Sequence, residues 1–448
     1  MDHPPEKGHT AVDEHRTDAA PLDPMAATAS VTAEAPQPPA APERLVTAGF
    51  QTSLFFAFLG TWTALLPATG ITLALKVNQI DPAGKATSLS LVLGVGAFVA
   101  LIAQNIFGAL SDRTSSPFGM RRPWILGGMV AGAASLIGLA FASNIPMLVG
   151  AWALTQLTFN ILLAGLNPVI PDQVPRRQLG RVSGLIGITQ VIAGVAGAFL
   201  AQAFLPDLTA AILIPGVALL VLVSVFLFVL KDRRLRREDV APFDLLLFLK
   251  AFWTSPRKAP DFALAWVSRL LVTFGNMTLA NYQLYFLLDR FGFTQANVGQ
   301  AVLLLTLIGA ATTIPTSILL GRLSDRLGRR KMFVLLSAII VAVAHIVAAM
   351  APSFAVFVIA AVVAGLALGA YLAVDQALIA EVLPSRGDVA KDMGVLHLAN
   401  VLPQTLVPVT APLFLMIGGG DNYAALFIGG AIVAIIGAII NQFIRSVR

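Results

Sequence analysis

Gly108–Arg113 reads GALSDR and Gly321–Arg326 reads GRLSDR, so one short motif occurs twice in a chain of 448 residues. Each copy follows a long apolar stretch and precedes a pair of arginines, Arg121 with Arg122 and Arg329 with Arg330. The ends of two later apolar stretches also match, with Asp172 in one and Glu381 in the other. This spacing indicates two halves built from the same succession of elements.

The composition is typical of a protein that spans a membrane. Hydrophobic residues make up 57% and charged residues 12%, whereas soluble domains average about 45–50% and about 25%. The absence of cysteine excludes disulfides, thiolate metal sites and cysteine nucleophiles. Neither a GxxxxGK[ST] phosphate loop nor an HExxH motif occurs, so we expect no ATP-driven chemistry, no cofactor and no metal.

Apolar runs long enough to cross a hydrocarbon core of about 30 Å recur along the chain. We predict an all-α membrane protein with twelve transmembrane helices in two pseudo-symmetric six-helix bundles. The predicted spans are Thr47–Leu75, Ala86–Leu110, Pro123–Ala142, Pro146–Ile170, Ser183–Phe204, Thr209–Leu230, Phe262–Leu288, Asn297–Gly321, Met332–Met350, Ser353–Leu383, Met393–Ile417 and Tyr423–Ile444.

The segments between and before these spans differ in charge. Loops after even-numbered spans are rich in arginine and lysine, whereas loops after odd-numbered spans carry Lys76, Lys85 and Arg290, so both termini are predicted to be cytoplasmic. The proline-rich residues 1–43 are predicted to be a disordered tail. Residues 44–230 and 262–448 are the predicted bundles, joined by a basic linker over 231–261. The basic loops report topology, so we expect a lipid bilayer as surroundings and no nucleic acid.

The duplicated GxLSDR motif with its following arginine pair resembles the cytoplasmic-loop signature of the major facilitator superfamily, and the resemblance extends over residues 45–444. Within that superfamily, Thr114–Trp124, Asn167–Pro175, Ala390–Gly394 and Asn400–Gln404 look like the sucrose-carrier and glycoside–pentoside–hexuronide branches. The resemblance implies a monomeric, multi-pass protein of the plasma membrane. It also implies proton-coupled uptake of a neutral sugar or glycoside by alternating access.

The duplicated loops have a physical interpretation as gates. Glycine lets a helix end pack closely, and the aspartate can reach the N-terminus of a neighbouring helix while the arginines pair with it or stay in water. Such loops are predicted to hold the two halves together in one state and release them in another. The proposed gating residues are Gly108, Asp112, Arg113, Arg121, Arg122, Gly321, Asp325, Arg326, Arg329, Arg330 and Glu381.

Charged residues inside the predicted spans are rare, and such residues are costly in a bilayer unless paired or hydrated. Asp375 and Arg269 lie at matching depths, about 12 Å and about 10 Å from the cytoplasmic ends of their helices at 1.5 Å per residue. We therefore expect them to face each other, either as a coupling pair in which Asp375 takes up a proton or as a fixed structural ion pair.

Gln156 and Asn160 share one face of the fourth span, and amides can both donate and accept hydrogen bonds to a polyhydroxylated ligand. Interhelical hydrogen bonding explains them equally well. Compared with plant sucrose carriers, Gln156 stands where a buried aspartate is expected, and it cannot titrate. Either Asp375 takes over as the proton carrier or the protein couples differently, and His397 in the eleventh span is a second titratable candidate.

The seventh span supplies further polar side chains, with Asn276 and Gln283 seven residues apart on nearly one face. His345 in the ninth span is expected to lie outside the site, because third helices of each half pack peripherally in this family. The predicted substrate site is completed by one aromatic residue in each half and two amides of the eleventh span: Trp62, Tyr371, Asn400 and Gln404.

Three other functions remain open at this stage. A proton-antiport exporter of small amphiphilic compounds has the same architecture, and apolar cavity walls favour it. A membrane-embedded enzyme needs clustered nucleophiles, metal ligands or paired carboxylates at one depth, and none is evident in the sequence. A sensor needs a signalling domain, for which only the tail and the linker offer length.

Overall fold

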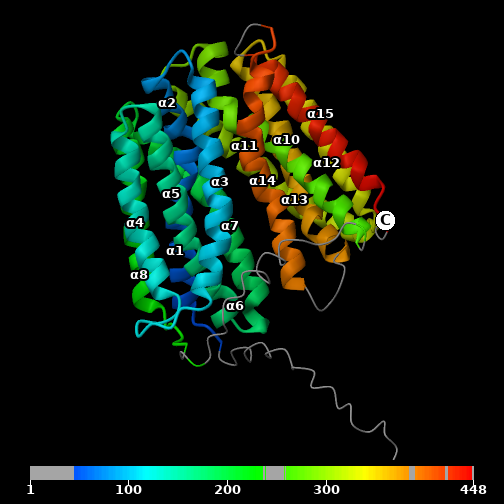
Figure 1. Ribbon diagram of the computed structural model, residues 1–448. Helices are drawn as coiled ribbons and strands as arrows, with labels where there is room; N and C mark the ends of the chain where they lie inside the picture. Colours follow the sequence, from blue (N-terminus) through cyan, green and yellow to red (C-terminus); the bar gives the residue numbers. More distant parts are fainter. Residues whose placement is uncertain are drawn as a thin grey trace, which may run out of the picture. The chain divides into compact units, whose positions relative to one another are not determined.

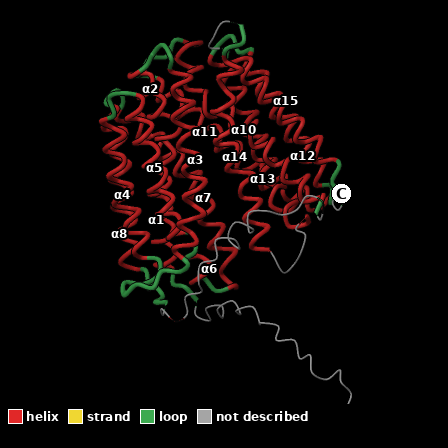
Figure 2. The backbone as a smooth tube through the Cα atoms, viewed as in Figure 1, coloured by secondary structure: helices red, strands yellow, loops and turns green. Residues whose placement is uncertain are grey.

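The described residues form helices joined by short turns (Figures 1 and 2). This computed structural model describes residues 45–235, 238, 257, 259–382, 389–418 and 422–445, without the side chains of residues 325, 376–377, 379–382, 389–394 and 397. The predicted tail over residues 1–43 and most of the predicted linker over 231–261 therefore lie outside the described residues, as do the side chains of Asp325, Glu381 and His397.

Twelve helical segments in the described part of the chain are long and apolar enough to cross a membrane, which confirms the predicted fold class. The first combines α1 (Ala48–Pro67), the π-helix η1 (Ala68–Thr72) and α2 (Leu73–Ile80). The fourth combines α5 (Ile145–Leu166) with the short α6 (Val169–Gln173). The others are α3 (Lys85–Ser111), α4 (Arg122–Phe141), α7 (Arg176–Phe204), α8 (Leu208–Val229), α10 (Pro260–Phe291), α11 (Val298–Leu327), α12 (Arg330–Ala349), α13 (Phe354–Val382), α14 (Val389–Leu415) and α15 (Tyr423–Gln442).

Three helix ends differ clearly from the predicted spans, and one of them is the end of the eighth, which runs past Gly321 to Leu327. The first span continues past Leu75 to Ile80, because the amine of Lys76 donates a hydrogen bond to the carbonyl of Ala140 at 2.7 Å and is accommodated within the helix. Pro67 ends α1, and the chain passes through a π-turn before α2 begins. The fifth helix begins at Arg176, seven residues before the predicted Ser183, because the apolar run marks where a helix meets lipid and not where its hydrogen bonds begin.

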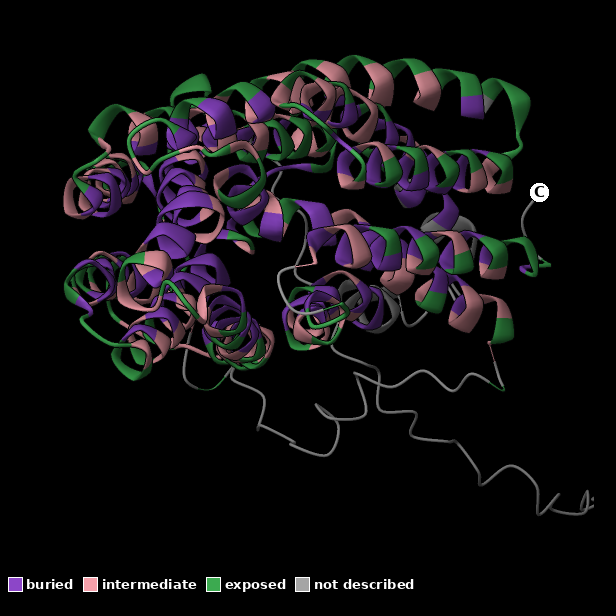
Figure 3. Ribbon diagram, turned by 90° about the horizontal axis from the view of Figure 1, so that it is seen from above, coloured by how far each residue is buried: buried purple, intermediate pink, exposed green. Residues whose placement is uncertain are grey.

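The helices before and after the linker pack into two groups. α1 packs on α7 and α8, α5 packs on α3 and α4, α10 packs on α15, and α13 packs on α11 and α12. α3 with α14 and α7 with α11 join the two groups (Figure 1). Figure 3 shows buried residues turned toward the inside of these groups and exposed residues on their outer faces. Aliphatic side chains dominate those outer faces, as expected where lipid is the solvent.

Two neighbouring glycines of α4 make the packing against α5 testable. A Cβ atom added at Gly128 falls 2.4 Å from the backbone nitrogen of Leu162, whereas one added at Gly127 meets nothing within 4 Å. Gly128→Ala is therefore expected to cost about 1–3 kcal/mol of stability through overpacking, and Gly127→Ala to leave stability unchanged or raise it by up to about 1 kcal/mol. Thermal unfolding in lipid nanodiscs measures both, and equal effects contradict this packing.

Candidate functional site

A cavity of about 510 Å³ lies between α7 of the first group and α10, α11, α12 and α13 of the second. That volume is in the range of small-molecule binding sites. Most of its wall is aliphatic, with Phe357 as the aromatic member. The polar side chains in the wall are Gln190, Asn276, Gln283, Thr306, Thr313 and His345.

Close helix packing shapes the α11–α13 side of this cavity. The Thr313 hydroxyl donates to the carbonyl of Gly365 at 3.0 Å. A Cβ at Gly369 would fall 2.6 Å from the carbonyl oxygen of Thr313, so glycine is required there for the two helices to approach. On the opposite wall the Asn276 amide donates to the carbonyl of Val272 at 3.0 Å, which leaves its second N–H and its oxygen for a ligand.

Arg269 and Asp375 are in contact, as their matching depths suggest. Arg269 Nη2 lies 3.0 Å from Asp375 Oδ2, and the two side chains are 9% and 6% exposed. Arg269 Nε also donates to Asn400 Oδ1 at 2.7 Å, and Tyr371 lines the same spot. The cavity beside them measures about 10 Å³, which is room for at most one water molecule.

The structure thus divides six of the predicted site residues between two places. Asn276 and Gln283 line the large cavity, whereas Arg269, Asp375, Asn400 and Tyr371 form a separate buried charge cluster. His345, expected to be peripheral, is 2% exposed and lines the large cavity, because α12 packs beside α13 as well as α15. Residue number gives the face of a helix on which a side chain lies. It does not give the neighbouring helix or cavity that this face contacts.

The remaining predicted substrate residues lie elsewhere. Trp62 is half-buried against the hydrophobic core. Asn160 is buried and donates to the carbonyl of Gln156 on its own helix at 2.8 Å. Gln156 packs near Gly96 of α3, and Gln404 is exposed. None of these four lines the cavity of about 510 Å³ among its described wall residues.

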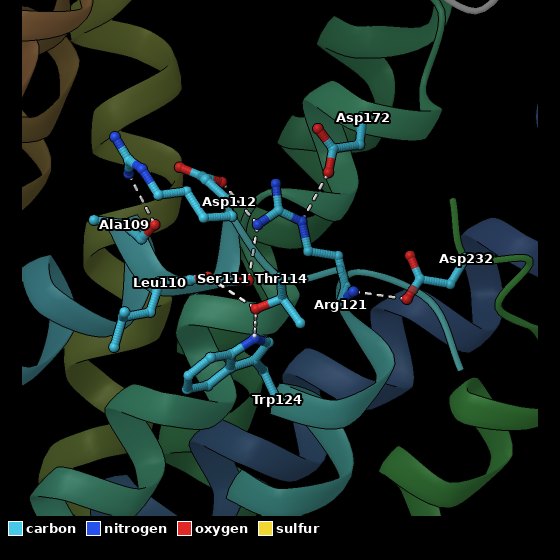
Figure 4. A network of polar contacts seen from close by, with 10 residues as sticks. Ala109, Leu110, Ser111, Asp112, Thr114, Arg121, Trp124, Asp172 and Asp232 are labelled. Atoms are coloured by element: carbon cyan, nitrogen blue, oxygen red, sulfur yellow. Dashed lines mark hydrogen bonds and ion pairs between the residues drawn. The ribbon is translucent and has the colours of Figure 1, made fainter. Parts of the chain in front are cut away.

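The first GxLSDR loop is organised around Arg121, which is 3% exposed (Figure 4). Its guanidinium contacts Asp112 at 2.7 Å, Asp172 at 2.9 Å and the hydroxyl of Ser111 at 2.8 Å. Asp172 comes from α6, so the arginine connects the end of the fourth span to the loop after the second. We call the end of the molecule that carries this network the basic end, and the end that carries Lys85 the opposite end.

Asp232, directly after α8, is a member of this network that the sequence analysis missed. Its Oδ2 accepts the backbone N–H group of Arg121 at 2.6 Å (Figure 4) and that of Arg122 at 2.7 Å, where α4 begins. A carboxylate at a helix N-terminus is favourable. Gly119 has φ +111°, and a Cβ there would fall 2.3 Å from Asp232. Gly119, two residues before Arg121, was the feature of the sequence that could have indicated a close contact at this loop.

Removing this cap gives a local test. Asp232→Ala is expected to cost about 1 kcal/mol, within the usual range for loss of a helix N-cap. Arg234→Ala, at an exposed neighbour, serves as the control and is expected to change stability by less than about 0.5 kcal/mol. Thermal unfolding compares them, and an equal loss in both variants contradicts the capping role.

The other proposed gating residues have simpler surroundings. Arg122 donates to the carbonyls of Leu227 and Leu230, and Arg113 donates to that of Ala109 at 3.0 Å. A Cβ at Gly108 would meet nothing within 4 Å, so the close packing expected there is absent from this conformation. In the second copy Gly321 lies near Ala373, Arg330 is half-buried, and Arg326 and Arg329 are exposed.

At the opposite end, polar contacts join the two groups of helices. Lys85 of α3 forms an ion pair with Asp289 of α10, and Tyr423 of α15 donates to the same carboxylate at 2.8 Å. The hydroxyls of Ser90 and Tyr282 lie 2.7 Å apart. Tyr285 donates to the carbonyl of Ala74 at 3.0 Å. These contacts close the opposite end in this conformation.

The part of the chain that the structure describes has twelve membrane-length helices in two groups with a cavity between them, and together with the family match below these features define a multi-pass membrane transport protein and not an enzyme. The sequence profile of the Major Facilitator Superfamily matches residues 50–317 and 304–448. The chain belongs to that superfamily, which confirms the resemblance at that level.

Known proteins resemble the chain to different extents. The D-xylose transporter of Levilactobacillus brevis is 37% identical over 110 residues, which is 24% of this chain and 22% of the relative. Among solved structures, the nucleoside transporter NupG superposes with a TM-score of 0.69 at 13% identity, covering 88% of this chain and 99% of that one. A bacterial homologue of the human lysosomal transporter Spinster, in an inward-facing and occupied conformation, gives 0.66 at 13% identity, covering 88% and 95%. At these identities the solved structures show the fold alone.

Proposed function

We propose that the protein takes up a neutral sugar or glycoside together with a proton, by alternating access between two six-helix bundles. The carrying observation is the cavity between α7 and α10–α13, whose described wall offers amides, hydroxyls and an imidazole but no carboxylate, guanidinium or amine. Such groups match a ligand with many hydroxyls and no net charge. The short match to a D-xylose transporter supports the same substrate class.

The proposed coupling group is Asp375. Its contact with Arg269 stabilises the carboxylate, whereas protonation removes the attraction and frees the arginine for Asn400 alone. The pair and Asn400 lie on three helices, α10, α13 and α14. A change in Asp375 charge therefore alters how these helices hold one another, which is a route from proton binding to helix movement.

The proposed orientation puts the basic end in the cytoplasm, because arginine-rich loops favour that side. The conformation then has its extracellular end closed by the Lys85–Asp289 pair. The Arg121 network holds the amino-terminal bundle together at the other end, since its partners Asp112, Asp172 and Ser111 all belong to that bundle. The proposed latch between bundles belongs to the opposite state of the cycle.

A second candidate is proton-driven export of small amphiphilic compounds. Most of the cavity wall is aliphatic, including Leu279, Leu305 and Leu368, and such walls suit ligands with apolar surface. The polar groups Asn276 and Gln283 then contact the polar end of such a ligand.

Reconstituted vesicles separate the two candidates. D-xylose, sucrose and a phenyl glycoside are offered to vesicles with an imposed inward proton gradient. Import predicts accumulation of labelled sugar that stops with an uncoupler. Export by antiport predicts no sugar accumulation. It predicts instead that a hydrophobic dye moves out of the vesicles while protons move in. If none of these solutes moves under the imposed proton gradient, the proposal is overturned.

A further inference from the structure

His345 is a buried titratable group that the proposed mechanism does not use. It lies on α12, about 22 Å from the helix start at Arg330 at 1.5 Å per residue, and is 2% exposed. Nδ1 is 2.8 Å from the carbonyl oxygen of Val341, one turn earlier on the same helix. Nε2 is 3.0 Å from the carbonyl oxygen of Gly275 on α10.

A neutral imidazole cannot make both of these contacts as hydrogen bonds. A carbonyl oxygen can only accept a hydrogen bond, and a neutral imidazole carries one N–H. Whichever tautomer is present, the neutral ring therefore turns the lone pair of one nitrogen toward a carbonyl oxygen. The imidazolium carries two N–H groups and satisfies both carbonyls.

Among the described residues, both ring nitrogens of His345 contact carbonyl oxygens and neither contacts a carboxylate. Several titratable groups of the helices packed on α12 have other described partners: Arg269 and Asp375 bind each other, Tyr282 contacts Ser90, Tyr285 binds Ala74, and Tyr423 binds Asp289. Tyr371 lies at the Arg269–Asp375 cluster. The rings of Phe427 on α15 and His345 are nearly perpendicular, with their centroids 6.3 Å apart. His345 can therefore exchange its proton without breaking an ion pair, and the two carbonyl contacts favour the charged ring.

We propose that His345 is a second, reversible proton-binding site in the wall of the cavity, and that its protonated ring clamps α12 to α10. Val341 and His345 both line the cavity, and Gly275 adjoins Asn276, which lines it as well. Loss of the proton breaks one of the two hydrogen bonds and loosens this wall. Occupancy of the cavity and protonation of His345 are thereby linked, whichever ligand the cavity takes.

The test observes the proton directly and needs no substrate. The protein is labelled with ¹⁵N in its five histidines, His3, His9, His15, His345 and His397, and placed in lipid nanodiscs for solid-state NMR between pH 4.5 and 8.5. His345→Gln assigns the signal by its disappearance, and His397→Gln is the matched control. Dipolar coupling to ¹³C-labelled glycine carbonyls assigns it independently through Gly275, should the variant not fold.

The proposal predicts that the assigned His345 ring carries both N–H groups at low pH and loses one proton within this range. It also predicts that the dependence of Tm on pH over this range differs between the wild type and His345→Gln by several degrees. A His345 ring that is neutral throughout, or cationic throughout, overturns the proposal. Neither outcome bears on sugar uptake or on Asp375, so the two proposals fail separately.

Discussion

Asp375→Asn is expected to cost about 3–5 kcal/mol of stability and to abolish proton-driven uptake, because it leaves Arg269 as a buried cation without its counter-ion. Arginine cannot release its proton at any usable pH. Arg269→Met is expected to cost less, about 1–3 kcal/mol, because the remaining Asp375 takes up a proton and becomes neutral. The asymmetry follows from the chemistry of the two side chains at a site where both are less than a tenth exposed.

The double variant Arg269→Met/Asp375→Asn separates stability from coupling. Replacing both charges by neutral groups removes the unpaired cation, so its Tm is expected to return close to that of the wild type. Its uptake is expected to lose all dependence on the proton gradient. Thermal unfolding in nanodiscs and labelled-sugar uptake into vesicles measure the two effects. Equal losses in both single variants contradict the proposed asymmetry, and proton-dependent uptake by the double variant removes Asp375 from the coupling role.

The helical architecture could be predicted because it depends on local composition. A run of apolar residues needs no partner to identify it as a span, and the repeat of GALSDR and GRLSDR needs no structure to indicate two halves. The ends of the helices were harder to predict from the sequence. Lys76 looks like a terminus in the sequence, yet its amine finds the carbonyl of Ala140 more than sixty residues away and the helix continues.

The site could be predicted only in part, because its geometry depends on contacts between residues far apart in the sequence. Depth along a helix follows from residue number, and depth alone suggested that Arg269 meets Asp375. Rotation about the helix axis relative to the neighbours does not follow from residue number. His345 therefore came to line the cavity, whereas Gln156 and Asn160, which share a helical face, do not. Asp232 was missed because its role depends on the last residues after α8 folding back to the start of α4.

Locking the opposite end is expected to stop transport completely and reversibly. A Cβ at Gly94 of α3 would lie 3.9 Å from the Cβ of Pro408 on α14, within the range of about 3.5–4.5 Å found in disulfides. The double variant Gly94→Cys/Pro408→Cys should therefore form a disulfide between the two bundles on oxidation. Because the chain has no cysteine of its own, this is the only disulfide that can form within the molecule. We expect uptake to fall at least tenfold after oxidation and to recover with a reductant.

The two single variants are the controls, and each should transport equally well with and without oxidant. Mass spectrometry of peptides joined through positions 94 and 408 establishes the bond itself. The physical reason for the block is that alternating access requires the bundles to separate where Lys85, Ser90 and Ala74 now meet the second bundle. If the oxidised double variant carries sugar at the rate of the reduced one, the bundles do not part at this contact, and a route other than opening of the opposite end must admit the substrate.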